Sequence, residues 1–484
     1  MIETPRLILW AAVLTLANVL ADVVIGSPMM VVPQLLDHFG TDQTAWLNAS
    51  AMLAGAVWSP LFARCADVYG RRRTLTVALL LACAGALICL AAPVLWVFLL
   101  GRFLQGAAFA AVFLTVALVL GICSARVAMT VIGVVTSSSS VVGIIEPFLM
   151  KPVIDAFGHQ GVFATAAVLA AAAAAGVRLL VPESPVRSRG RIDVVGALLL
   201  GGGLGAVLAY ISLGGDLGWL SIGMTVLLVT GALALGAWVF RTLRVNEPII
   251  DIRALTRPVL LTLLVLVLAA GAFRSMLQLI GIVAYVPPGL GLGYGLGDGT
   301  AVAALFAAAN LGIALGGIGA GWLAGRIGPA RPLLGGIAVG ILATYAMVPG
   351  TSVPPLAMCC GGLLGVAAGA IGASGYNLAT SLEAPERQGS VAGLVSVVSA
   401  LGSVLFTIGG GEVLEATRIP GVLVDGAPAS TATGVHLYIA ASGLLLVLAA
   451  VPATMLARNA RRPPARAARR SVAPDAPSSG SVVP

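Results

Sequence analysis

Fourteen predicted apolar segments of about 20 residues each follow one another along this chain, and they constrain its fold more than any other feature. A helix needs about 20 mostly apolar residues to cross the hydrocarbon core of a bilayer, which is roughly 30 Å thick. Only 10% of the 484 residues are charged, whereas an ordinary soluble domain carries about 25%. So few charges cannot cover a surface in water. A soluble enzyme is therefore excluded, and most of the exterior must face lipid.

The distribution of basic residues orients these segments. The predicted spans are 8–32, 45–64, 74–92, 95–120, 127–150, 160–181, 192–213, 219–241, 258–285, 299–325, 332–350, 354–380, 389–414 and 434–457. With the first residue in the cytoplasm, 23 of the 27 Lys and Arg residues fall in inside segments. Because Lys and Arg concentrate in cytoplasmic loops, we predict a multi-pass protein with both termini cytoplasmic.

The segment after the second span carries the most informative motif. Residues 63–73 read Ala-Arg-Cys-Ala-Asp-Val-Tyr-Gly-Arg-Arg-Arg. This stretch resembles the cytoplasmic signature of the major facilitator superfamily, G-x-L-a-D-r-x-G-r-r. A carboxylate at one helix end can accept hydrogen bonds from the N-terminus of a neighbouring helix, whose unpaired amides carry partial positive charge. The resemblance implies that this neighbour starts near Gln388 to Ser390. The predicted gate motif consists of Asp67, Gly70, Arg71, Arg72 and Arg73.

Two further motifs resemble the same superfamily, namely a second, weaker copy of the loop signature at 321–331 and the R-x-x-Q-G pattern at 102–106. The Pro-Glu-Ser stretch at 182–184 with 189–196, and residues 247–253, narrow the resemblance to the fourteen-helix drug:proton antiporter group. The resemblance implies an all-α major facilitator fold with two related six-helix halves and an extra central hairpin. The predicted units are 1–181 for the N-terminal half, 182–257 for the extra helices with their flanking loops, 258–457 for the C-terminal half, and 458–484 for a disordered cytoplasmic tail.

Polar residues inside the spans are the candidates for function. A charged side chain at bilayer depth costs about 2.5–3.5 kcal/mol on insertion scales, so it normally faces a cavity or a partner. The proton-coupling candidates are Asp22, Arg102 and Glu146, and the substrate-cavity candidates are Gln105, Arg274, Gln278 and Asn310. A carboxylate whose surroundings alternate between inward and outward water can load and release a proton.

Each candidate has a structural alternative. Asp22 and Arg102 could form a permanent buried pair that only joins helices. Glu146, which stands where the antiporter signature G-P-x-x-G-G has its first glycine, could be an interfacial carboxylate paired with Lys151 or solvated. The four serines at 137–140 favour helix packing over substrate contact. The three histidines, His38, His159 and His436, are expected to stay apart near the outer face, so no metal site is predicted.

Together these features predict a secondary transporter, not an enzyme. The favoured function is proton-coupled efflux of drugs or other small lipophilic or amphiphilic compounds by alternating access. The alternatives are a dedicated exporter of one metabolite, such as a natural product of the same cell, and a proton–solute symporter; an intramembrane enzyme or receptor is remote. We expect no cofactor beyond the proton motive force, and no nucleic-acid partner. The partners are then a small-molecule substrate, protons and the lipid bilayer, with a monomer in a bacterial inner membrane.

Overall fold

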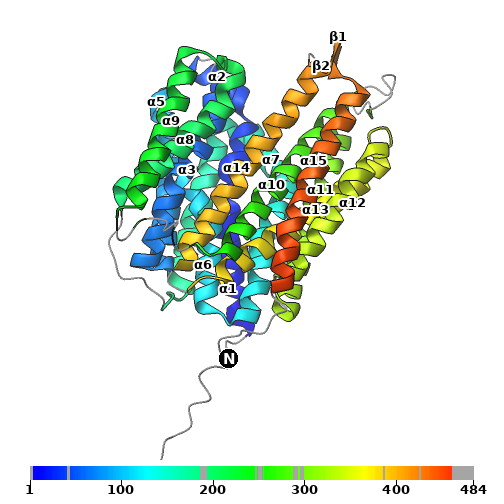
Figure 1. Cartoon of the computed structure of the whole chain (residues 1–484). Helices are drawn as coiled ribbons and strands as arrows, with labels where there is room; N and C mark the ends of the chain where they lie inside the picture. Colours follow the sequence, from blue (N-terminus) through cyan, green and yellow to red (C-terminus); the bar gives the residue numbers. More distant parts are fainter. Residues whose placement is uncertain are drawn as a thin grey trace, which may run out of the picture.

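The computed structural model describes residues 4–40, 44–185, 193–245, 248, 253, 255–286, 293–294, 299–384, 387–424 and 427–459. These residues are almost entirely helical (Figure 1). The first elements are α1 (Thr4–Met29), α2 (Val32–Phe39), α3 (Thr44–Tyr69), α4 (Arg71–Ala91), α5 (Leu95–Gln105), the 3-10 helix η1 (Gly106–Phe109), α6 (Ala110–Ile122) and α7 (Ala125–Leu180). They are followed by α8 (Val194–Leu217), α9 (Ile222–Thr242), α10 (Arg257–Tyr285), α11 (Gly299–Ile327), α12 (Ala330–Gly350), α13 (Pro354–Ser381), α14 (Gln388–Ala416), β1 (Arg418–Val424), β2 (Ala427–Ser430) and α15 (Ala432–Asn459).

Thirteen helices within the described residues are long and apolar enough to cross a membrane. They coincide with thirteen of the fourteen predicted spans, which confirms a multi-pass, all-helical membrane protein. The remaining predicted span, 45–64, lies within α3, which is not among the thirteen. The count of fourteen therefore stays a prediction.

The predicted loop between the fifth and sixth spans is helical instead. Helix α7 continues through it, and only Gly158, with φ 59° and ψ −152°, leaves the helical range. Lys151 Nζ lies 2.9 Å from Asp155 Oδ2, and such an i,i+4 pair supports a continuing helix. Glycine provides the break because it adopts a positive φ without a steric penalty.

Two short elements were not predicted from the sequence. Helix α2 follows α1 after a brief turn, and its C-cap, Gly40, has a left-handed φ of 57°. Strands β1 and β2 pair as an antiparallel hairpin between α14 and α15. Both elements lie at the end of the bundle opposite the start of α1 (Figure 1).

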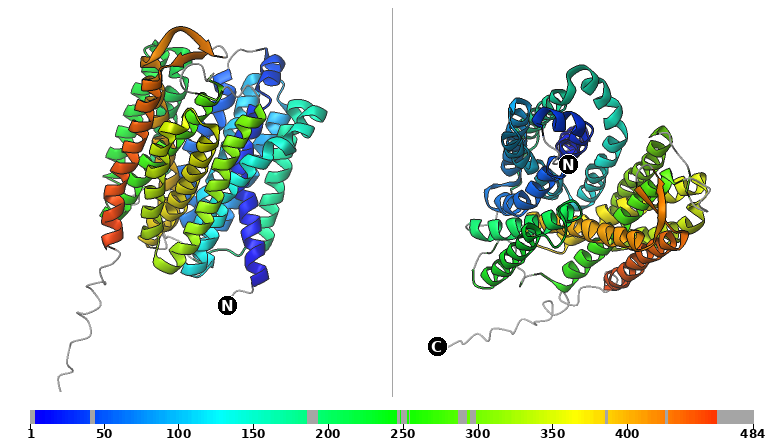
Figure 2. Two further views of the ribbon diagram at one scale, coloured as in Figure 1. Left: turned by 90° about the vertical axis from the view of Figure 1, so that its right-hand side faces the viewer. Right: turned by 90° about the horizontal axis from the view of Figure 1, so that it is seen from above.

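The helices form two groups, with α8 and α9 beside them. Helices α1–α7 make one group and α10–α15 the other, as the view from above shows (Figure 2). Helix α1 begins and α15 ends at the same end of the bundle (Figure 1). We call this the arginine-rich end, because α4 begins there with Arg71 to Arg73 and α15 ends there just after Arg458.

The extra hairpin α8–α9 covers the line along which α3 meets α14. Buried Ala197, Leu200 and Leu204 of α8 pack against Leu61 of α3. The same apolar cluster includes three residues of α14, namely Leu394, Val397 and Leu401. One helix of the hairpin thus contacts both groups at once.

Candidate functional site

Asp67 joins the two groups of helices at the arginine-rich end. Its Oδ2 atom accepts a hydrogen bond from the backbone N–H of Ser390, with N···O 3.1 Å, and a second from the Ser390 hydroxyl at 2.6 Å. Ser390 lies in the first turn of α14, where unpaired backbone amides favour a negative charge. Asp67 itself is 2% exposed. The partner is the one that the motif predicts, whereas the role of the contact as a gate stays a prediction.

The other residues of the gate motif fix the start of α4. Gly70 precedes α4 with a φ of 105°, which L side chains rarely adopt. Arg71 Nη1 donates to the carbonyl of Ala117 at 2.5 Å, and Arg72 Nη1 donates to the backbone carbonyl just after α7 at 3.1 Å. Arg73 is exposed. Arg71 also interacts electrostatically with Asp67, so the motif holds its own carboxylate in place.

Glu183, which the sequence offered only as part of a family motif, caps the same helix. Its carboxylate accepts from the backbone N–H of Arg72 at 2.9 Å and of Arg73 at 3.3 Å. A carboxylate in this position satisfies amides that the first turn of a helix leaves unpaired. Glu183, which follows α7, is therefore tied to the start of α4, a few residues after Asp67 at the end of α3.

The groups also meet where α7 crosses α11, and there glycines allow close contact. A methyl group at Gly133 would lie 2.5 Å from the carbonyl oxygen of Gly317. One at Gly321 would lie 2.7 Å from the carbonyl oxygen of Met129. Ser137 packs on Gly317 in the same interface. Like the Asp67 contact, this glycine interface is at the arginine-rich part of the bundle.

Polar side chains line the interface between α1 and α7. Asn18 Nδ2 donates to the carbonyl of Val135 at 3.0 Å and to the hydroxyls of Ser138 and Ser139 at 3.3 and 3.1 Å. Asn18 is 1% exposed. The packing role predicted for the serines of α7 is confirmed at these two positions, and their partner Asn18 was missed by the sequence analysis.

Two carboxylates lie further along the α1–α7 interface. Asp22 is half-buried, its carboxylate lies beside Ser139, and its buried Oδ2 atom has no hydrogen-bond partner among the described residues. Glu146 of α7 accepts a hydrogen bond from the hydroxyl of Ser27 and is 9% exposed. A methyl group at Gly26 would lie 2.9 Å from Glu146 Oε2, so the glycine makes room for the acid. Asp22 and Glu146 interact electrostatically.

The predicted partners of these carboxylates are wrong. Arg102 does not pair with Asp22: its Nη1 donates to the carbonyl of Val24 at 2.7 Å and to Gln105 Oε1 at 2.9 Å. Lys151 pairs with Asp155 rather than with Glu146. The Arg102 pairing failed because spacing along a span does not define how a helix is rotated toward its neighbour. The Lys151 pairing failed because α7 continues through this segment, which places Glu146 and Lys151, five residues apart, on different faces of one helix.

The four substrate-cavity candidates fall in different places. Gln105 does not line a cavity as predicted, because it is 0% exposed and accepts a hydrogen bond from Arg102 inside the α1–α7 group. Arg274 and Gln278 of α10 are exposed, and the guanidinium of Arg274 has no hydrogen-bond or ion-pair partner in the described part of the chain. Gln278 Oε1 accepts from the hydroxyl of Tyr438 at 3.3 Å. Asn310 faces Gly143 across the interface of α7 with α11.

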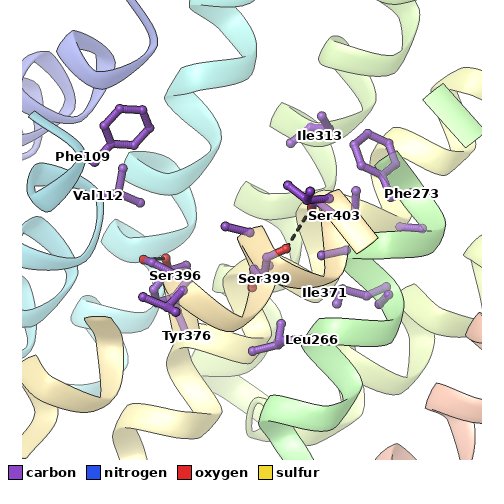
Figure 3. Close-up of a pocket in the computed structure, with 18 of the residues that line it drawn as sticks. Phe109, Val112, Leu266, Phe273, Ile313, Ile371, Tyr376, Ser396, Ser399 and Ser403 are labelled. Atoms are coloured by element: carbon purple, nitrogen blue, oxygen red, sulfur yellow. Dashed lines mark hydrogen bonds between the residues drawn. The ribbon is translucent and has the colours of Figure 1, made fainter. Parts of the chain in front are cut away.

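A cavity of about 490 Å³ lies between the two groups of helices (Figure 3). Phe109 and Val112 bound it on one side, and Phe273 and Ile313 stand across from them. Leu204 of α8 completes part of the wall. None of the four predicted substrate residues lines this cavity.

The polar atoms of the cavity wall are chiefly hydroxyls that the sequence analysis missed. Ser396, Ser399 and Ser403 share one face of α14, and Tyr376 of α13 and Ser59 of α3 add two more. Their signal was present as serines at i, i+3 and i+7 in an apolar span, which is the spacing of one helix face. Serines in an apolar span are typical of helix packing, so this pattern did not predict a cavity wall.

The histidines were predicted to stay apart, and this is wrong for two of them. The rings of His38 and His159 lie 4.8 Å apart between centroids, because α2 packs against α7 beside the break at Gly158. Among the described residues, no group of three or more His, Cys, Asp or Glu side chains is arranged to hold a metal ion.

Comparison with known proteins places this arrangement in a family. The model of the Major Facilitator Superfamily matches residues 14–407. The multidrug resistance protein Stp of Mycobacterium tuberculosis (strain CDC 1551 / Oshkosh) is 30% identical over 215 residues, which cover 44% of this chain and 40% of that protein. The lincomycin resistance protein of Streptomyces lincolnensis is 33% identical over 163 residues, 34% of each chain. The matched regions thus span less than half of these relatives.

The fold is also similar to solved structures. The human organic anion transporter MFSD10 superposes with a TM-score of 0.65 at 15% identity, covering 94% of this chain and 100% of that one. At this identity the likeness concerns the fold alone.

Proposed function

Because the chain belongs to the Major Facilitator Superfamily, we propose that it is a proton-coupled secondary transporter that exports small lipophilic or amphiphilic compounds by alternating access. The relatives named for drug resistance support the direction and the cargo. We place it in a bacterial inner membrane, with the arginine-rich end in the cytoplasm, acting as a monomer without a cofactor.

The cavity between the two groups of helices carries this proposal. Gly55 and Phe109 contribute to its wall from the α1–α7 group, and Phe273 and Ser399 from the α10–α15 group. A site shared by two groups that rock against each other opens to one side of the membrane at a time. In this proposal the Asp67 contact and the glycine interface close the arginine-rich end, and the conformation described here is the one closed toward the cytoplasm.

The α1–α7 interface supplies the proton-binding groups in this scheme. Asp22 and Glu146 lie in one row with Asn18, Ser139 and Ser27, whose hydroxyl and amide groups can hydrogen-bond a carboxylate in either protonation state. In the outward-facing form a proton binds a carboxylate of this row, and in the inward-facing form it leaves to the cytoplasm as the groups re-pack. Proton entry favours return of the empty carrier, so the gradient drives export. Arg102, held by Gln105, positions α5 beside α1 and takes no proton.

Transport in reconstituted vesicles tests the proposal. With an imposed pH gradient, Asp22→Asn and Glu146→Gln should each reduce gradient-driven accumulation of a fluorescent lipophilic substrate by about tenfold or more. The matched control is Asp155→Asn, since that side chain is 60% exposed and pairs only with Lys151 among the described residues. Coupling that survives in both variants would remove this row from the mechanism.

Cargo is tested separately by growth of an efflux-deficient host that expresses the chain. Protection against several unrelated toxic compounds is the expected result. Protection against a single compound would favour the dedicated exporter, and accumulation in place of protection would favour a proton–solute symporter.

A further inference from the structure

The wall of the cavity includes part of the extra hairpin. Leu204 and Leu208 of α8 line it, although α8 lies outside the two six-helix groups. The hairpin is held firmly at the arginine-rich end, where Asp193 caps α8 by accepting from Gly196 N at 2.9 Å. The same carboxylate lies 2.9 Å from Arg241 Nε of α9. A wall anchored in this way can set the size of what the cavity admits.

Among the described residues that line the wall, the only polar side-chain groups are hydroxyls, and one of these hydroxyls is uncommitted. The Tyr376 hydroxyl lies 2.5 Å from Ser396 Oγ, and Ser396 Oγ is also within 3.5 Å of the carbonyl of Ala392. Ser403 donates to the carbonyl of Ser399 at 2.9 Å (Figure 3). The hydroxyl of Ser399 itself donates to no described residue. It can therefore donate to a molecule in the cavity.

We propose that this cavity binds an uncharged lipophilic molecule that places a hydrogen-bond acceptor against Ser399, with α8 as the wall that limits its size. The inference rests on the proposed function, and it names the class of substrate. A volume of about 490 Å³ lies in the range of small-molecule sites. Most of the described side chains on the wall are aromatic or aliphatic, among them Phe109, Phe273 and Leu266.

The cavity disfavours charged ligands. An ion that enters it loses its hydration and meets no opposite charge, because none of the described residues on the wall is Asp, Glu, Lys, Arg or His. Attraction of a cation to the faces of Phe109, Phe273 or Tyr376 recovers only a part of that cost. Arg274, one helical turn beyond the lining residue Ala270, repels a cation further, while its attraction for an anion from off the wall does not replace the hydration that the anion loses. The carboxylates Asp22 and Glu146 lie in the α1–α7 interface and not on the wall.

Three probes of one shape test this. Triphenylphosphine oxide is neutral with a strong acceptor, methyltriphenylphosphonium carries the same rings and a positive charge, and triphenylacetate is the matching anion. We would measure binding of each to the full chain in lipid nanodiscs without a gradient, subtracting binding to empty nanodiscs. The oxide should bind about tenfold or more tightly than either ion. An ion that binds within about twofold of the oxide would overturn the proposal.

Variants locate the binding. Leu208→Trp should weaken binding of the oxide by about tenfold, because the larger side chain fills part of the cavity. The control Leu233→Trp, at a residue of α9 that is 68% exposed, should leave binding of the oxide unchanged. Ser399→Ala should weaken it about fivefold, and Ser352→Ala, on an exposed turn, should not. Equal affinity in Leu208→Trp and wild type would also overturn it. Binding without gradient-driven transport would instead leave this site standing and remove the proposed function.

Discussion

Replacing Asp67 by asparagine should open the arginine-rich end. The carboxylate accepts two hydrogen bonds from Ser390 at the start of α14, at 3.1 and 2.6 Å, and is 2% exposed. Asparagine keeps the size and one acceptor oxygen but loses the charge. Hydrogen bonds to a charged acceptor are roughly twice as strong as neutral ones, and the helix N-terminus adds about 0.3–1 kcal/mol. After allowance for the cost of burying the charge, we expect a loss of about 1–2 kcal/mol, which shifts the closed–open equilibrium about 5- to 30-fold.

Cysteine labelling measures this shift directly. Ala400 lines the cavity and is exposed within it, so Ala400→Cys in a chain whose six native cysteines are replaced by alanine reports access to the cavity. Inside-out vesicles present the cytoplasmic face to a membrane-impermeant maleimide. The labelling rate is proportional to the fraction of molecules open at that end. Asp67→Asn should raise this rate about 5- to 30-fold.

Glu415→Gln is the control for the labelling measurement. It removes an exposed carboxylate that pairs with Arg418 near the opposite end, and it should leave the labelling rate unchanged. An unchanged rate in a stably folded Asp67→Asn protein would mean that the contact with Ser390 does not hold this end closed. In that case the carboxylate has a structural role within the α1–α7 group.

Two further predictions concern neighbouring contacts. Gly321→Val should raise the same labelling rate about tenfold or more, because its Cβ would lie 2.7 Å from the carbonyl oxygen of Met129, while Gly319→Val, with open space around it, should not. Glu183→Gln should weaken the cap of α4 by about 1 kcal/mol and lower the thermal unfolding midpoint in detergent by roughly 2–4 °C. The exposed Glu412→Gln is the control for that measurement, and an equal midpoint in both variants would contradict the capping role.

The membrane fold was predictable because it depends on properties that are local in sequence. Segment length and hydropathy define a span, and arginine placement orients it. The helical run through Lys151 and Asp155 and the break at Gly158 were not predicted, since a short polar segment fits a loop and a helix equally well. The same local ambiguity hid α2 and the β1–β2 hairpin.

The site was only partly predictable, and the reason is helix rotation. The Asp67 motif specified both a carboxylate and the kind of partner it needs, and Ser390 provides it. Hydropathy placed Asp22 and Arg102 at a similar depth but could not say which way each points; one lies against α7 and the other bonds Gln105. Residues whose role is to pack or to donate one hydroxyl, such as Ser399, look in sequence like any other small residue of a membrane helix.

The two contacts that join the helix groups at the arginine-rich end differ in kind, and this makes them sensitive to different conditions. The α3–α14 contact depends on a carboxylate, so protonation at low pH or a substitution that removes the charge weakens its hydrogen bonds. The α7–α11 contact depends on the shape of glycine faces, where a methyl at Gly325 would already lie 3.0 Å from the carbonyl oxygen of Arg126. Shape contacts are lost over a fraction of an ångström. Evolution can therefore adjust the resting equilibrium of such a carrier through one contact while the other keeps the closed state well defined.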